Sequence, residues 1–225
     1  MPSSLRATIR NLLPRAVARL TRDSRNLDSR ARFTYFRLQL RRFLGLRRSG
    51  TRLLLPAIHS VLFVCHGNIM RSPLAAGLLR MYLCDSTRQR TSIGSAGLHA
   101  QPGRPADDRA ISVAREFGVD LGGHQTQLLT AELAAQADLI LVMDYQNEAE
   151  LLARFPQFKG KIALLGDYRD PESATEGEIE DPYTGDLDGV QRSFRMIQSC
   201  ARRLALLLNS NTASRSDLTG EAGPK

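Results

Sequence analysis

Cys65 and Arg71 are separated by five residues, in a segment that reads CHGNIMRSP from position 65 to position 73. A loop of this length can wrap around a phosphate group and offer backbone N–H groups to its oxygens, and a helix that follows adds its positive end. Such surroundings favour a thiolate at the start of the loop. The planar fork of an arginine matches two phosphate oxygens, and Gly67 lets the backbone approach the anion. The pattern predicts a nucleophile at Cys65 and a phosphate clamp at Arg71.

The spacing alone is weakly specific, because arginine is abundant in this chain. Cys84 is followed at the same distance by Arg90, but that segment lacks glycine and carries Asp85 where an anion would have to lie. We therefore interpret Cys84 as a core or helix-end thiol. The context of Cys65 is different, since an apolar run precedes it and Ser72-Pro73 opens a helix-like segment behind it.

Alternating apolar segments supply the elements that must position this loop. A continuous apolar run of four residues is typical of a strand buried on both faces. Four units of strand followed by helix predict a parallel, doubly wound α/β sheet with helices on both faces, and sites gather at the carboxyl ends of its strands. The expected strands are 61–64, 91–95, 139–142 and 162–165, and the expected helices are 73–83, 106–117, 147–154 and 190–208.

The charge is unevenly distributed along the 225 residues. Residues 1–55 carry a net charge of +12 from arginines, whereas residues 56–225 carry −4, which together give +8. We expect a basic N-terminal extension (1–57), a catalytic domain (58–208) and a disordered polar tail (209–225). The extension contains apolar residues at helical spacing from Leu5 to Leu20, with Pro14 as a breaker, and a second basic apolar segment at 33–48. It fits a flexible extension or an early translation start, or else contact with a membrane surface or a partner; nucleic acid has no strong case.

The three cysteines, an odd number, argue against a disulfide framework. The first 20 residues have arginines inside every apolar run, so no signal peptide is expected, and no segment approaches the roughly 20 apolar residues of a membrane span. The sequence thus favours a cytoplasmic protein with reduced thiols.

The segment VLFVCHGNIMRSP resembles the active-site motif of low-molecular-weight protein tyrosine phosphatases. Further blocks resemble the same family in order and approximate spacing, and the resemblance covers residues 58–208. These blocks are Gly94-Ser95-Ala96-Gly97, Gly123-His124, Ala137-Asp138-Leu139-Ile140 and Asp181-Pro182-Tyr183. The resemblance implies an enzyme without metal or cofactor that hydrolyses phosphotyrosine on a protein through a phosphocysteine at Cys65.

The resemblance assigns the general acid, and then the general base, to Asp181. The rival pair Asp170-Pro171 is followed by Glu172 rather than by an aromatic residue. Tyr183 either forms one wall for a substrate ring or anchors its loop. Asn68, Ser72, Ser95 and His124 match a hydrogen-bond network beneath the phosphate-binding loop, and Ser72 is also expected to cap the helix. The remaining residues of that loop are His66, Gly67, Asn68, Ile69, Met70 and Ser72.

Several positions depart from relatives or discriminate among them. Met70 stands where many relatives carry a second cysteine, so we expect oxidation of Cys65 to pass more readily to irreversible forms. Ile69 stands where relatives that act on phosphoarginine have threonine, which favours phosphotyrosine. Gln125 and Gln127 replace basic residues and make the rim less positive. The alternatives are a phosphoarginine phosphatase, or an arsenate reductase of the same fold, which would need further cysteines. The family includes bacterial members that act on tyrosine kinases of exopolysaccharide export, and the SAGL and DPY blocks lean toward these.

Overall fold

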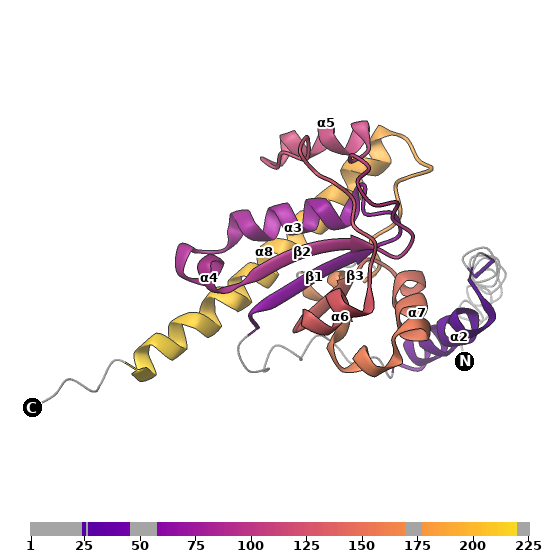
Figure 1. The fold of residues 1–225 in the computed structure, drawn as a ribbon, viewed down its shortest axis with the longest axis horizontal. Helices are drawn as coiled ribbons and strands as arrows, with labels where there is room; N and C mark the ends of the chain where they lie inside the picture. Colours follow the sequence, from indigo (N-terminus) through magenta and orange to yellow (C-terminus); the bar gives the residue numbers. More distant parts are fainter. Residues whose placement is uncertain (1–23, 26, 46–57, 170–176, 220–225) are drawn as a thin grey trace, which may run out of the picture.

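A computed structural model describes residues 24–25, 27–45, 58–169 and 177–219. Four parallel strands form one sheet in the order β2-β1-β3-β4 (Figure 1). The predicted four-stranded parallel sheet is confirmed. The strands are β1 (Ser60–Cys65), β2 (Ser92–Gly97), β3 (Leu139–Val142) and β4 (Ile162–Leu164).

Helices cover both faces of this sheet because the strand side chains alternate between two apolar cores. In β1, Val61 and Phe63 point into one core, and Leu62 and Val64 point into the other. Helices α3, α5 and α8 pack on the first face, and α6 and α7 pack on the second. Their bounds are α3 (Arg71–Tyr82), α5 (Asp108–Glu116), α6 (Ala131–Gln136), α7 (Tyr145–Arg154) and α8 (Leu187–Thr219).

Some short elements were missed by the sequence interpretation. Helix α4 (Asp85–Arg90) and α6 lack the long apolar periodicity on which the prediction relied, and α6 begins with a Thr130 cap. The 3₁₀ segments η2 (Pro156–Lys161) and η3 (Leu165–Tyr168) flank β4. The strand predicted at 91–95 lies one or two residues later, at Ser92–Gly97.

The start of α3 differs from the prediction in one respect. The cap position is Met70, no side chain caps this helix, and Ser72 lies inside its first turn. The predicted capping role of Ser72 is wrong, because its hydroxyl contacts the Cys65 sulfur instead. Pro73 is tolerated in the first turn, where its missing N–H would have had no helical partner.

The end of α8 also differs, because the helix continues to Thr219 where the sequence predicted a disordered tail from Asn209. Asn209 accepts a hydrogen bond from the Cys84 backbone N–H at 3.2 Å and donates to the Tyr82 carbonyl at 3.4 Å. Extending a helix that is already anchored costs little, since each added residue gains a backbone hydrogen bond. Residues 220–225 lie outside the described residues.

Within the described part of the chain, none of the helices has both the length and the apolar character needed to cross a membrane.

Part of the N-terminal extension is a helix that packs on the catalytic domain. Helix α2 (Ser29–Phe43) begins at Asp28, whose Oδ1 accepts the Ala31 N–H at 2.8 Å. Leu27, Ala31 and Tyr35 are buried in the same core as α7, and Figure 1 shows α2 beside α7. For residues 27–45 the expectation of a flexible extension is therefore wrong, because one face of the helix is apolar enough to pack. The predicted helical pattern from Leu5 to Leu20 lies outside the described residues.

Candidate active site

The Cys65 sulfur lies at the carboxyl end of the central strand β1, in an almost fully buried position. Its Sγ accepts the backbone N–H of Asn68 at 3.2 Å and lies 3.0 Å from the Ser72 hydroxyl oxygen. That hydroxyl also lies 3.3 Å from the Ala96 carbonyl, and its single hydrogen can serve only one of these two acceptors. A charged sulfur is the stronger acceptor. The Asn68 N–H and the Ser72 hydroxyl are thus both placed to donate to the Cys65 sulfur.

The backbone of residues 65–71, here called the 65–71 loop, turns its carbonyl groups outward. The carbonyls of Cys65 and His66 accept the N–H groups of Leu98 and His99, both within 2.9 Å. Those of Asn68, Ile69 and Met70 are likewise bound by groups outside the loop, namely His124 Nε2, Asp107 N and Leu74 N. Each N–H points opposite to the carbonyl of the same peptide unit. The amides of the loop are thus directed inward, toward the space above the sulfur, where an anion would bind them.

Asn68 holds this loop in shape. It is fully buried and has a φ of 57°, in the left-handed region that asparagine tolerates better than most residues. Its Nδ2 donates to the hydroxyls of Ser72 at 2.9 Å and Ser95 at 3.0 Å. Its Oδ1 accepts the Gln127 N–H at 2.8 Å, and its carbonyl accepts His124 Nε2 at 2.7 Å. The structure thus brings together the supporting residues that the sequence interpretation proposed.

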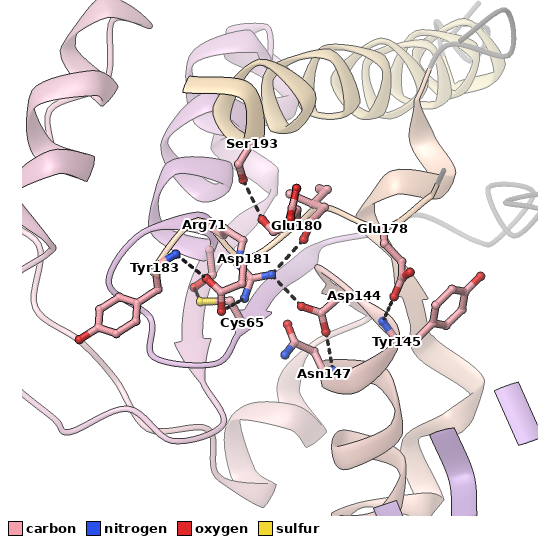
Figure 2. Close-up of polar contacts among 12 residues, drawn as sticks. Cys65, Arg71, Asp144, Tyr145, Asn147, Glu178, Glu180, Asp181, Tyr183 and Ser193 are labelled. Atoms are coloured by element: carbon pink, nitrogen blue, oxygen red, sulfur yellow. Dashed lines mark hydrogen bonds and ion pairs between the residues drawn. The ribbon is translucent and has the colours of Figure 1, made fainter. Parts of the chain in front are cut away.

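Arg71 lies between two carboxylates (Figure 2). Its Nη1 donates to Asp144 Oδ2 at 2.7 Å and to the Ile179 carbonyl at 3.0 Å, and its Nη2 donates to Asp181 Oδ2 at 2.6 Å. Burial alone would lower the pKa of Arg71, but the charges of Asp181 and Asp144 outweigh it and raise that pKa above its ordinary value. The guanidinium is therefore charged and held from two sides.

Asp144 is the functional residue that the sequence interpretation missed. It follows β3 at the carboxyl edge of the sheet, and its Oδ1 caps α7 by accepting the Asn147 N–H at 2.7 Å. Its other oxygen orients Arg71, so one carboxylate joins the helix start to the clamp. An acidic residue directly after a buried strand was the available signal, because sites gather at that edge.

A pocket opens above the sulfur. Asp181, about half exposed, and Tyr183, 55% exposed, come from the segment before α8 and border this pocket with Arg71. The Asp181 Oδ1 accepts the Tyr183 N–H at 3.2 Å, which fixes the turn that carries both residues. The lining residues are Cys65, His66, Gly67, Ile69, Met70, Arg71, His99, Gln101, Arg104, Asp181 and Tyr183. His99, Gln101 and Arg104 had not been predicted from the sequence, since they lie in a loop without a motif.

His66 and His99 form one side of the pocket mouth. Their ring centroids are 4.5 Å apart, and His99 Nε2 lies 2.5 Å from Glu150 Oε1. Burial and the neighbouring His99 lower the pKa of His66 below its ordinary value. At neutral pH this wall is therefore mainly an uncharged ring surface at His66.

The other two cysteines lie away from the pocket. Cys84 is exposed at the start of α4, where hydrogen bonds with Ser86 and Thr87 lower its pKa to about 7. It is a helix-end thiol, and the alternative of a core thiol is wrong. Cys200 is buried in α8, and burial raises its pKa to about 12. The rival acid pair Asp170-Pro171 lies outside the described residues.

Comparison with known proteins identifies the family of this chain. The family profile described as "Low molecular weight phosphotyrosine protein phosphatase" matches residues 60–214, well over half of the chain. The chain belongs to this family, and its relatives are named protein-tyrosine-phosphatases, so it is a phosphoric monoester hydrolase.

Named relatives match about two thirds of this chain over most of their own length. A probable low molecular weight protein-tyrosine-phosphatase, EpsP of Ralstonia nicotianae, is 39% identical over 141 residues, which cover 63% of this chain and 90% of the relative. Etp of Escherichia coli is 36% identical over 151 residues, covering 67% and 95%.

Solved structures resemble the same part of the chain. The YwlE arginine phosphatase of Geobacillus stearothermophilus has a TM-score of 0.61 at 29% identity, covering 69% of this chain and 96% of that one. The tyrosine phosphatase Wzb of Escherichia coli K30, in complex with sulphate, has a TM-score of 0.59 at 33% identity, covering 67% and 99%.

Proposed function

We propose that the protein hydrolyses phosphotyrosine on proteins in two steps, with Cys65 as nucleophile, Arg71 as clamp and Asp181 as acid and base. The observation that carries the proposal is the convergence of these three side chains on one pocket above a loop whose amides point inward. The phosphoryl group would bind the amides of the 65–71 loop and the guanidinium of Arg71.

In the first step the Cys65 thiolate attacks phosphorus and the bond to the tyrosine oxygen breaks. Asp181 gives its proton to that oxygen, because a phenolate with a conjugate-acid pKa near about 10 is a poor leaving group at neutral pH. In the second step Asp181, now ionised, takes a proton from water while the water oxygen attacks phosphorus. The phosphorus–sulfur bond breaks, which releases inorganic phosphate and restores the thiolate.

The contacts of Arg71 give the two carboxylates different parts in this scheme. Asp144 is mostly buried and fixed by its capping bond, so it keeps Nη1 in place. Asp181 is far more exposed and holds only Nη2. A bound phosphate dianion competes with Asp181 for that group, and Asp181 is then released to face the leaving oxygen.

A leaving-group series tests this assignment. In Asp181→Asn we expect hydrolysis of phenyl phosphate to fall by about 10²–10⁴-fold and that of p-nitrophenyl phosphate to fall much less, because nitrophenolate leaves without a proton. Cys65→Ser should abolish both activities. Equal losses for the two esters would contradict the acid role of Asp181.

A pull-down with Asp181→Ala would then identify the phosphoprotein, for which a tyrosine kinase of exopolysaccharide export is our first candidate.

A phosphoarginine phosphatase is the second candidate, supported by the likeness to YwlE. Two pocket residues favour phosphotyrosine: Ile69 adds an apolar surface near the sulfur, and Arg104 repels the cationic group of phosphoarginine. We expect a higher kcat/KM for a phosphotyrosine peptide than for the matching phosphoarginine peptide. Ile69→Thr should lower the ratio of these two kcat/KM values. A preference for phosphoarginine in the unmodified enzyme would reverse the ranking.

An arsenate reductase is less consistent with the site, because Cys65 is the only one of the three cysteines, all of them described, that lines the pocket.

A further inference from the structure

Helix α2 presents an apolar stripe on the side that faces away from the domain. Its side chains are 41–85% exposed, and they account for five of the ten large exposed hydrophobic side chains among the described residues. Successive members are three or four positions apart, so they share one helix face. The stripe consists of Phe33, Phe36, Leu40, Phe43 and the adjoining Leu44.

This stripe is not a packing surface of the domain itself. The opposite face of α2 carries Ala31 and Tyr35, which are buried against the core that α7 shares. The helix is therefore apolar on two sides, and only one of them is covered by residues that the structure describes. Contiguous exposed apolar surface of this kind marks a site of contact with a protein or a membrane.

Arginines border the stripe. Residues 27–45 contain five arginines and a single acid, Asp28, whose carboxylate already caps the helix. Arg30, Arg37 and Arg41 are exposed and lie along one flank of the stripe, because they are seven and four positions apart and seven residues make about two helical turns. Arg42 is turned the other way, toward Glu178 at 3.7 Å. The outer surface of α2 thus combines aromatic and leucine side chains with positive charge alone.

We propose that the outer face of α2, consisting of the stripe and its flanking arginines, binds the surface of an anionic lipid bilayer. The phenylalanine and leucine side chains would enter the boundary between headgroups and acyl chains, and the arginines would contact the lipid phosphates. A helix of 15 residues extends about 22 Å and carries charge, so it lies along the interface. This inference does not depend on the proposed catalytic mechanism.

Other occupants fit the same surface less well. A second copy paired through the same stripe would bring two positively charged surfaces together, because a two-fold interface is formed by one patch with itself. Nucleic acid would neutralise the arginines but leave five large apolar side chains in water. An anionic bilayer satisfies both features at once.

Co-sedimentation of the full-length protein with vesicles tests the proposal. We expect binding to phosphatidylcholine vesicles that contain phosphatidylserine, weaker binding to pure phosphatidylcholine, and a loss of affinity with added salt. Phe36→Ser combined with Leu40→Ser should weaken binding by about 100-fold, at roughly tenfold per apolar side chain. Arg37→Gln combined with Arg41→Gln should weaken it by about 25-fold, since each surface arginine contributes about fivefold.

Matched controls come from α8, which exposes residues of the same types. Leu206→Ser and Arg203→Gln should leave vesicle binding within about twofold, because neither side chain lies on α2. All variants should hydrolyse p-nitrophenyl phosphate at the unmodified rate, since they change exposed residues that do not line the pocket. No binding to anionic vesicles, or binding that the α2 variants do not weaken, would overturn the proposal. So would self-association or oligonucleotide binding that the same variants abolish while vesicle binding persists.

Discussion

Removing the side chain of Asn68 should destabilise the protein by an amount that the contacts allow us to work out. This side chain serves Ser72, Ser95 and the Gln127 N–H at 2.9, 3.0 and 2.8 Å, in a fully buried position. A lost buried hydrogen bond costs about 1 kcal/mol, so Asn68→Gly should lose about 3 kcal/mol. Asn68→Ala should lose about 4 kcal/mol, because alanine at a φ of 57° adds about 1 kcal/mol of backbone strain that glycine avoids.

Urea unfolding followed by far-ultraviolet circular dichroism measures this order. The transition midpoint should fall from the unmodified protein to Asn68→Gly and again to Asn68→Ala, with an unchanged slope. Asn209→Ala is the matched control. Its two hydrogen bonds lie at the partly exposed junction between α3 and α4, so their loss should cost less than about 1 kcal/mol. Alanine at least as stable as glycine would refute the strain argument. Values within about 0.5 kcal/mol of the unmodified protein for both variants would refute the role of the hydrogen bonds.

Three further predictions concern the loop and the thiols. Gly97→Ala should lower kcat/KM more than about tenfold, because an added Cβ would lie 2.8 Å from Asn68 N and His66 O beneath the loop. Steady-state kinetics measures this loss of kcat/KM, and an unimpaired enzyme would argue against a rigid loop. Alkylation of the exposed Cys84 should slow about tenfold per pH unit below pH 7, because its thiolate fraction falls, while Cys200 stays unmodified in the native state. Peptide mass spectrometry measures the labelling of both cysteines, and equal labelling of the two would contradict the assigned burial. Met70→Cys should let dithiothreitol restore the peroxide-treated enzyme, whereas the unmodified enzyme stays inactive; full recovery of the latter would contradict the absence of a resolving thiol.

What the sequence predicted well is local along the chain. Cys65, Arg71 and the amides between them occupy one short loop, and a buried strand before it and a helix after it are enough to define its shape. Three of the predicted strands, 61–64, 139–142 and 162–165, are likewise recognisable locally, because each is a continuous apolar run. The resemblance to a family then pointed to Asp181, and the aromatic Tyr183 behind Asp181-Pro182 distinguishes it from Asp170, whose proline is followed by Glu172.

What the sequence did not predict depends on contacts between distant residues. Asp144 meets Arg71 from 73 positions away, and only the order of strands brings β3 beside β1. The sequence suggested that Ser72 caps the helix, but the cap position is Met70, two residues earlier, and no side chain caps this helix. A flexible extension was one of the expectations for the segment that forms α2, but the fold places the apolar face of α7 against Ala31 and Tyr35.

The contact between α2 and the catalytic machinery indicates what the N-terminal extension can and cannot do. Arg42 pairs with Glu178 at 3.7 Å, and the next residue, Ile179, accepts a hydrogen bond from Arg71. A partly exposed ion pair of that length contributes at most about 1 kcal/mol, which corresponds to about a fivefold change in rate. The relatives are matched over 90–95% of their own length by about two thirds of this chain. Binding of α2 to a surface should therefore change where the enzyme acts far more than how fast it acts.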